Sequence, residues 1–527
     1  MTTENSITAP EQAAEKIAIK DDLAVHSLAP SLHDAEQLKT AVGADEAQQY
    51  VGAEVIEVAE EDSRRILKKI DWHLLPIMCG LYCMQYIDKV LLSFASAMGI
   101  QKDIHLNPDE YAWAGSIFYG GYLVFAYPHN RLLQRLPVAK YMAVAVMIWG
   151  AILCFSALVK NAAGLLISRF FLGAMEGSVT AGFVLVTASW YRAEEQTFRT
   201  ALWFGSNGFA QIFGGIIAFG CVSGDEKNRL SIYTWQLLFL VVGAFTFLYG
   251  VMMWFCFADS PVKASWLSPD EKRLAIERLR SNQQGIGSRK FKWYQVKEAF
   301  TDIRTYIIFL STVTQNIPNG GVTVFFTALI QSYGFTTKET FLLSTPAGLV
   351  QIITNFGIPY VAQRYRNRMA GAVVGILICL FGISLMAGLA MDNHPLRAKA
   401  GQLIGYYLLI ATTAAPMILI LSVIATNTLG STKKTTVNAT SLVGYCIGFL
   451  IGPQCFRDPP YYYVAKYNII GMWIISLLCY IALYFVNRRE NAKRDREWRE
   501  AGCPVQPPGQ EFMDLTDREN RFFRYAL

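Results

Sequence analysis

Residues 235–257 read WQLLFLVVGAFTFLYGVMMWFCF and contain no charged side chain. A helix rises about 1.5 Å per residue and the hydrocarbon core of a bilayer is about 30 Å thick, so this stretch predicts a membrane-spanning helix. Similar stretches recur on both sides of it. Of the 527 residues, 53% are hydrophobic and only 17% are charged, against roughly 25% charged in soluble domains. The sequence therefore predicts an all-α membrane protein.

Twelve spans are predicted, in two groups of six. They lie near residues 73–95, 111–133, 138–159, 163–187, 200–221, 235–257, 304–331, 341–363, 369–390, 402–425, 435–456 and 467–487. We expect a disordered cytosolic tail at 1–70, a six-helix bundle at 71–257, a cytosolic loop at 258–303, a second six-helix bundle at 304–487 and a cytosolic tail at 488–527. Two bundles of this kind place a binding site near the middle of the membrane, between the halves.

The distribution of Lys and Arg predicts the orientation. Basic residues cluster before the first span, in the central hydrophilic segment and after the last span, for example Arg64, Lys69, Arg289, Arg488 and Arg494. Basic segments beside spans stay in the cytosol, so we expect both chain ends on the cytosolic side. Gly444, Gly448 and Gly452 are spaced four apart within one span, which predicts a helix face that packs closely on a neighbour.

Charged residues inside apolar spans are the candidate functional groups, because each costs several kcal/mol unless it is paired or hydrated. Asp88 and Lys89 lie in the first span, and Arg169 and Glu176 in the fourth. The second half has no comparable charge in the cores of its spans. Counting residues from the span ends puts Asp88 and Arg169 at a similar depth, about 9 Å below the outer surface, so we predict that they pair. Glu176 is expected about 10 Å deeper.

The charge count suggests a coupling chemistry. The four groups are neutral together when all are ionised, and protonation of one carboxylate leaves one surplus positive charge. That surplus can hold an anion, provided that burial raises the pKa of a carboxylate toward the working pH. Glu176 is the preferred proton site. The alternative interpretation is a static ion-pair network that holds the two helices together.

Uncharged polar residues are expected to complete the binding site or, alternatively, to form hydrogen bonds between helices. The candidates are Tyr119, Tyr122, Asn207, Gln211, Asn316 and Asn319. Around Pro318 a cluster of Asn and Gly residues predicts an interruption of the seventh span. No metal-ligand or catalytic constellation and no phosphate-binding loop is recognisable, so we expect no metal, no cofactor, no nucleic-acid partner and no enzyme.

Several motifs resemble those of the major facilitator superfamily and, within it, the anion:cation symporters of the fungal allantoate permease branch. The motifs are Ile87-Asp88-Lys89, Ser116 to Leu123, Arg169 to Gly177 with its Arg–Gly–Glu pattern, Ile317 to Gly321, Lys433 to Ala439 and Asp514 to Asn520. The resemblance implies a proton-coupling role for Asp88 and Glu176 and an anion-binding role for Lys89 and Arg169. Two departures concern the pocket: Lys89 stands where many relatives have Arg, and Ser178 to Gly182 replaces a Pro-Gly pair.

The functional expectation is a monomeric symporter in the plasma membrane that imports a small organic anion with protons. Allantoate, ureidosuccinate and nicotinate are substrate types that the resemblance implies. The alternatives are an exporter of a metabolite and a nutrient sensor that binds solute without moving it.

Overall fold

The computed structural model describes residues 59–224, 231–283, 291–365, 367–389, 395–503 and 514–527. This part of the chain is helical throughout. Its helices are α3 (Glu60–Ala97), α4 (Ile100–Asp103), α5 (Pro108–Leu133), α6 (Val138–Ser156), α7 (Ala162–Trp190), α8 (Ala193–Gly205), α9 (Asn207–Gly224), α10 (Thr234–Cys256), η2 (Pro261–Lys263), α11 (Pro269–Gln283), α12 (Trp293–Thr301), α13 (Ile303–Ser332), α14 (Thr337–Arg364), α15 (Arg368–Gly388), α16 (Pro395–Thr412), α17 (Ala414–Asn427), α18 (Ser431–Ile451), η4 (Gly452–Cys455) and α19 (Tyr463–Glu500).

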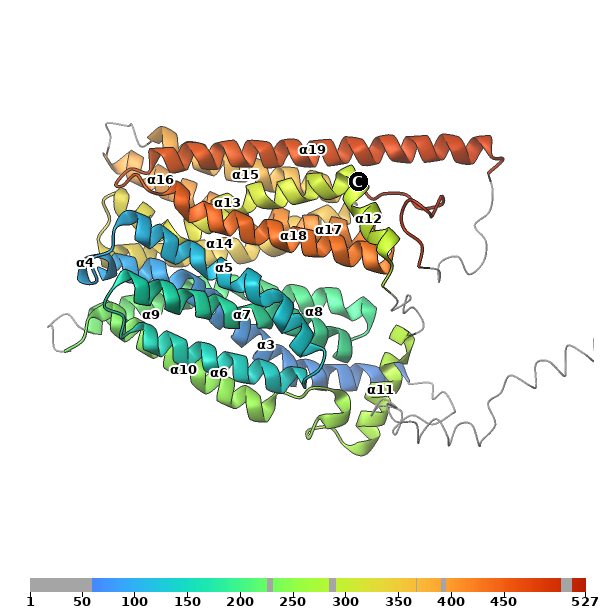
Figure 1. Cartoon of the computed structure of the whole chain (residues 1–527), viewed down its shortest axis with the longest axis horizontal. Helices are drawn as coiled ribbons and strands as arrows, with labels where there is room; N and C mark the ends of the chain where they lie inside the picture. Colours follow the sequence, from blue (N-terminus) through green and yellow to red (C-terminus); the bar gives the residue numbers. More distant parts are fainter. Residues whose placement is uncertain (1–58, 225–230, 284–290, 366, 390–394, 504–513) are drawn as a thin grey trace, which may run out of the picture.

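Ten helical segments in the described residues are long and apolar enough to cross a membrane; α8 with α9 and α16 with α17 count as one segment each. Helices α5 and α13 are equally long and run alongside them in the bundle (Figure 1). They are less apolar because they bury polar side chains against other helices, such as Ser116 on α5 and Asn316 on α13. The predicted all-α membrane fold is confirmed, and α5 and α13 together with the ten candidate spans match the predicted number of twelve.

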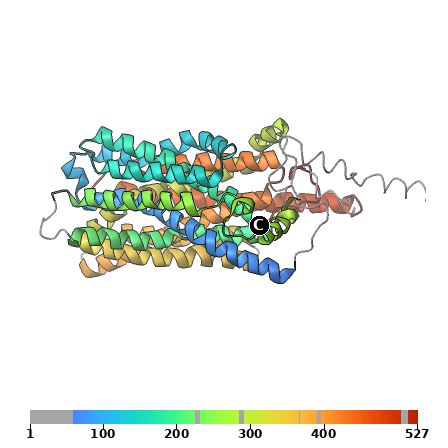
Figure 2. The same cartoon turned by 90° about the horizontal axis from the view of Figure 1, so that it is seen from below.

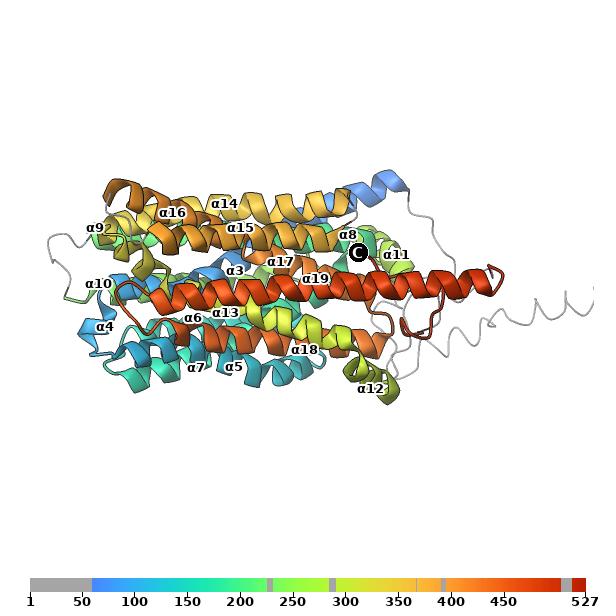
Figure 3. The ribbon, with the colours of Figure 1, turned by 90° about the horizontal axis from the view of Figure 1, so that it is seen from above.

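The halves lie side by side along the long axis, with the first half blue to green and the second half yellow to red (Figures 1 and 3). Glycines allow the closest approaches within each half. Gly121 on α5 faces the carbonyl of Phe170, and Gly173 on α7 faces the carbonyl of Phe118. A Cβ atom at either position would collide with backbone, so a small residue is required there.

The predicted glycine face of α18 is confirmed. Gly444, Gly448 and Gly452 lie against the carbonyls of Phe309, Val313 and Ile317 in turn, so each turn of one helix packs on a turn of α13. The predicted interruption of the seventh span is wrong, because α13 runs unbroken through Pro318. The close packing on α18 supports the helix there, and the Asn316 side chain donates a hydrogen bond to the Thr312 carbonyl at 2.7 Å.

The two ends of the bundle differ in how the halves meet. We call the end where α3 begins and α19 ends the terminal face, and the other end the opposite face (Figure 2). Toward the opposite face the halves are bonded together: Ser93 meets Thr327 at 2.9 Å, and Ser116 donates to the Leu450 carbonyl at 2.7 Å. The Tyr111 hydroxyl donates to the Val324 carbonyl at 2.9 Å. The halves are therefore closed against each other at the opposite face.

At the terminal face each half has its own cap (Figure 1). Helix α11 packs on the first half, where Lys69 pairs with Glu271 at 2.7 Å. Helix α12 and residues 514–527 pack on the second half. Parts of the expected tails and loop are helical. Helix α3 begins at Glu60, inside the expected tail at 1–70, and α19 extends to Glu500, inside the expected tail at 488–527. Helices α11 and α12 lie in the expected loop at 258–303. The expected tail up to residue 58 lies outside the described residues.

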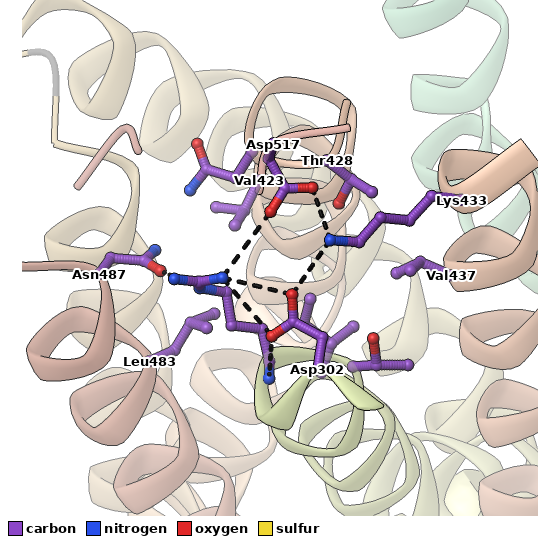
Figure 4. A pocket seen from close by; sticks show the side chains of 12 residues that line it. Asp302, Val423, Thr428, Lys433, Val437, Leu483, Asn487 and Asp517 are labelled. Carbon is purple, nitrogen blue, oxygen red and sulfur yellow. Dashed lines mark hydrogen bonds and ion pairs between the residues drawn. The ribbon is translucent and has the colours of Figure 1, made fainter. Parts of the chain in front are cut away.

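The cap on the second half is a buried charge cluster, which we name the Lys433 cluster: Lys433, Glu298, Asp302, Asp517 and Arg304. Figure 4 shows the ion pairs of Lys433 with Asp302 and Asp517. The Lys433 Nζ lies 2.9, 3.1 and 2.7 Å from the carboxylates of Glu298, Asp302 and Asp517. Burial acts to raise the pKa of Asp302, but the charges of Arg304 and Lys433 outweigh it and hold the pKa below its usual value.

The chain end closes over this cluster. The Tyr525 hydroxyl donates to Asp517 at 2.7 Å, and Arg494 of α19 donates to the Asp517 carbonyl at 2.8 Å. Asn427 exchanges hydrogen bonds with the backbone of Ala526 at 2.9 and 2.8 Å. A cavity of about 20 Å³ remains between the cluster and Asn487, which is room for about one water molecule. The cap therefore holds α12, α13, α17, α18 and α19 together.

Candidate functional site

The buried charges of the first half meet between α3 and α7. Glu176 is fully buried, and the Lys89 Nζ lies 3.0 Å from its Oε1. The two groups form a buried ion pair, and neither Glu176 oxygen is satisfied by a hydrogen bond from the described residues. Gln85, one turn before Lys89 on α3, lies beside the same carboxylate. Lys89 and Gln85 thus share the helix face that meets Glu176.

The predicted pairing of Asp88 with Arg169 does not form in this structure. Asp88 is fully buried, but neither of its oxygens has a hydrogen-bond partner among the described residues. Successive residues on a helix point about 100° apart, so when Lys89 faces Glu176, Asp88 faces elsewhere. It points toward Trp149 of α6, within the electrostatic reach of Glu176 and Arg169.

Arg169 lies buried on α7, two turns before Glu176. Its guanidinium stands over the ring of Phe118, 5.2 Å from the centroid. Its Nε and Nη1 find no hydrogen-bond acceptor among the described residues. A guanidinium with free donors in a buried site is suited to a carboxylate, which it can grip with two parallel hydrogen bonds.

Aromatic side chains from both halves border this charged group. Tyr119 on α5 stacks on Phe449 of α18 at 4.2 Å and meets Tyr445 edge-on at 5.9 Å. The Tyr119 hydroxyl has no hydrogen-bond partner among the described residues. Tyr122 is also buried, within the electrostatic reach of Glu176. The structure thus brings Tyr119 and Tyr122 close to the four charges, at the contact between α5 and α18.

The other predicted polar residues are more dispersed. Gln211 on α9 is buried with an unpaired Nε2 and packs against Gly348 of α14, so it lies where the halves meet. Asn316 packs within the second half, where Gly448 of α18 lies against it. Asn207 and Asn319 are half-buried.

Gln85 and Tyr445 also border the charged site and were not predicted from the sequence. Gln85 precedes Lys89 by four residues, and that spacing was a usable signal for a shared helix face. Tyr445 had no such signal, because only the packing of α18 on α5 brings it to Tyr119. Among the residues that the structure describes, no group of three His, Cys, Asp or Glu side chains could hold a metal ion.

The four buried charges allow the binding of a proton and of an anion to be linked. Two carboxylates and two bases balance when all are ionised, and the Lys89–Glu176 pair lies where the halves meet. Protonation of Glu176 would remove the negative partner of Lys89 and leave a surplus positive charge beside Arg169. Proton binding and anion binding can therefore depend on each other at this site.

Comparisons with known proteins agree on one family. The model of the Major Facilitator Superfamily matches residues 78–453. An uncharacterised transporter of Schizosaccharomyces pombe is 40% identical over 489 residues, covering 92% of this chain and 94% of its own length. The allantoate permease of Saccharomyces cerevisiae is 36% identical over 489 residues, covering 90% of this chain and 88% of its own.

A solved structure shares the fold at low sequence identity. It is a bacterial homolog of the human lysosomal transporter Spinster, in an inward-facing and occupied conformation. The TM-score is 0.59 at 14% identity, over 79% of this chain and 96% of that one. The helical architecture, the family match and the relatives together show that this chain is a multi-pass membrane transporter, not an enzyme, and that it belongs to the Major Facilitator Superfamily.

Proposed function

We propose that this protein is a proton-coupled symporter of the allantoate permease family that imports a small organic anion. The observation that carries the proposal is the buried Lys89–Glu176 pair beside Arg169, whose guanidinium has free donors. Four ionisable groups in the interior of one bundle are costly unless they serve ions that come and go. A static network is a weaker explanation, because Asp88 and Arg169 would then be expected to satisfy each other.

The proposed cycle follows from charge balance. A proton on Glu176 neutralises the carboxylate and frees Lys89. Lys89 and Arg169 then carry two positive charges against the single negative charge of Asp88, and an anionic carboxylate supplies the missing charge. When the proton leaves Glu176, the Lys89–Glu176 pair re-forms and the affinity for the anion falls. Asp88 contributes the fixed countercharge or a second proton site.

The proposed orientation places the terminal face in the cytosol of a cell whose plasma membrane holds the protein as a monomer. Basic residues of that face, such as Arg64, Arg65, Arg488 and Arg489, support this orientation. The hydrogen bonds that close the opposite face would then seal the site from outside. The conformation described is, on this proposal, one that is closed toward the outside.

The test is uptake of radiolabelled allantoate, ureidosuccinate and nicotinate by cells that lack their own permeases, at acidic and at neutral external pH. We expect accumulation of at least one of these anions, and stronger accumulation at acidic pH. Glu176→Gln should abolish accumulation driven by protons while exchange of internal for external substrate persists. Glu339→Gln, at an exposed carboxylate near the opposite face, is the matched control and should behave as wild type.

Two outcomes would contradict the proposal. Accumulation by Glu176→Gln with the pH dependence of the wild type would remove Glu176 from the coupling. Proton-dependent efflux in place of uptake would make the protein an exporter.

A further inference from the structure

A second group of buried polar side chains lies on the second half, on α14 and α16. Gln351 and Asn355 are four residues apart on α14 and therefore share one face of the helix. They are 4% and 5% exposed, and Tyr406 on α16 is fully buried. The Oε1 of Gln351, both amide atoms of Asn355 and the Tyr406 hydroxyl have no hydrogen-bond partner among the described residues. We name these three residues the amide wall.

The amide wall faces the first half. Tyr86 of α3 reaches the side chain of Gln351, and Tyr406 lies within the electrostatic reach of Tyr86. Gly348, one turn before Gln351, lies against the Gly208 carbonyl and the Gln211 side chain of α9. The wall thus lies at the contact between the halves, on the side formed by α3, α9, α14 and α16.

Packing alone does not explain these side chains. A buried polar group without a partner costs about 1–3 kcal/mol, and an apolar residue of similar size would avoid that cost. Buried polar groups in proteins are nearly always hydrogen-bonded, so a cluster of unpaired ones indicates partners that are bound only part of the time. The four atoms left unpaired include donors as well as acceptors, because each side-chain amide offers both.

Helix α3 links the amide wall to the charged site. Gln85 and Lys89 face Glu176, while Tyr86 points about 100° away from Gln85 and reaches the wall. Tyr86 and Lys89 are three residues apart, about 4.5 Å along the helix axis. One small molecule placed between the halves can therefore touch both regions once the halves separate.

We propose that Gln351, Asn355 and Tyr406, together with Tyr86, form a specificity site for an uncharged hydrogen-bonding group, of the amide type, at the end of the substrate remote from its carboxylate. This rests on the proposed function, because the charged site must hold the carboxylate. A site built to hydrogen-bond a polar group strongly rejects an analogue without that group, since its own buried atoms then stay unpaired.

Two acids of matched size and charge test the proposal. N-acetylglycine carries an amide, and 4-methylpentanoate replaces that amide by hydrocarbon of the same shape. Binding of each radiolabelled acid is measured on the purified full-length protein in lipid nanodiscs. We expect wild type to bind N-acetylglycine at least tenfold more tightly than 4-methylpentanoate. The double variant Gln351→Leu with Asn355→Leu should lose this preference and bind both acids with similar affinity.

A matched control separates specificity from general packing. Gln315 of α13 is a buried amide with an unpaired Oε1, but its Nε2 meets Met417 of α17 at 3.6 Å, inside the second half. Gln315→Leu should retain the preference for the amide. Equal affinity of wild type for the two acids would contradict the role proposed for the amide wall, but it would not contradict the carboxylate site. Failure of wild type to bind either acid would overturn the carboxylate site, and the amide wall with it.

Discussion

The two halves share one architecture but place their charges differently. The first half buries Asp88, Arg169 and Glu176 in the middle of its spans, and two of the three have no hydrogen-bonded or ion-paired partner among the described residues. The second half gathers most of its buried charges at the terminal face, where Lys433 contacts three carboxylates. Lys466 is also buried, but it lies at the opposite face against the rings of Tyr333 and Tyr463. The charges in the middle of the first-half spans are left available for ligands, whereas the charges of the Lys433 cluster are already paired and hold helix ends together.

The same difference extends to the uncharged groups. The interior of the second half carries amides and hydroxyls where the first half carries ions. We therefore expect substitutions of Asp88, Arg169 or Glu176 to change anion binding and proton coupling more than they change the stability of the fold. Variants of the Lys433 cluster should do the reverse.

The largest effect is expected from Arg169→Ala. Removal of the guanidinium takes away the donors that are free to bind a carboxylate. The affinity for the anion should therefore fall by more than about 100-fold, because a buried, charged pair of hydrogen bonds is lost. The measurement is equilibrium binding of a transported anion to the purified protein. The control is Arg131→Ala, at an exposed position near the terminal face. Wild-type affinity in Arg169→Ala would move the anion site elsewhere.

The next effect is on stability and comes from Lys433→Met. Loss of this lysine leaves the carboxylates of Glu298, Asp302 and Asp517 close together in a buried place, which should cost about 3–5 kcal/mol. Thermal unfolding of the purified protein should show a clear fall in Tm, while the affinity of the folded protein for its anion stays within about twofold of wild type.

The neighbouring lysine supplies the control for this variant. Lys434 donates to the Ala425 carbonyl at 2.7 Å and contacts no carboxylate in the described residues. Lys434→Met should therefore lower Tm far less than Lys433→Met. Equal falls in Tm, or loss of anion affinity in Lys433→Met alone, would break the division of labour between the halves.

The smallest effect is a pH dependence at the same cluster. The pKa of Asp302 is lower in the folded protein than its usual value of about 3.9, so the unfolded chain binds the proton more readily. The stabilising contribution of Asp302 is complete above about pH 4 and disappears as the pH falls through the folded pKa. The loss of Tm caused by Asp302→Asn should therefore shrink from neutral pH to about pH 3. The control is Asp270→Asn, at an exposed carboxylate of α11, which should change Tm little.

The fold could be predicted from the sequence because long hydrophobic stretches identify most of the spanning helices. Even the packing of α18 on α13 was foreseeable from the spacing of Gly444, Gly448 and Gly452, since a small residue every four positions forms one helix face. The continuity of α13 through Pro318 was not foreseeable, because it depends on the support of a neighbouring helix.

The residues of the charged site could be predicted, but their pairing could not. A charge within an apolar span identifies Lys89 and Glu176 without a structure. Depth along the membrane suggested that Asp88 pairs with Arg169, whereas the rotation of α3 about its axis turns Lys89 toward Glu176. That rotation is set by contacts of α3 with several helices at once, and depth carries no information about it. The amide wall was missed for a similar reason, because only tertiary packing brings Gln351 of α14 and Tyr406 of α16 near Tyr86 of α3.

The most direct test of the central claim is the uptake of protons on anion binding. Purified protein in a weakly buffered solution near neutral pH is mixed with a transported anion, and the change in pH is recorded. We expect wild type to take up protons when the anion binds, because a protonated Glu176 frees Lys89. We expect Glu176→Gln to bind the anion without taking up protons. Proton uptake of equal size in wild type and Glu176→Gln would contradict the claim.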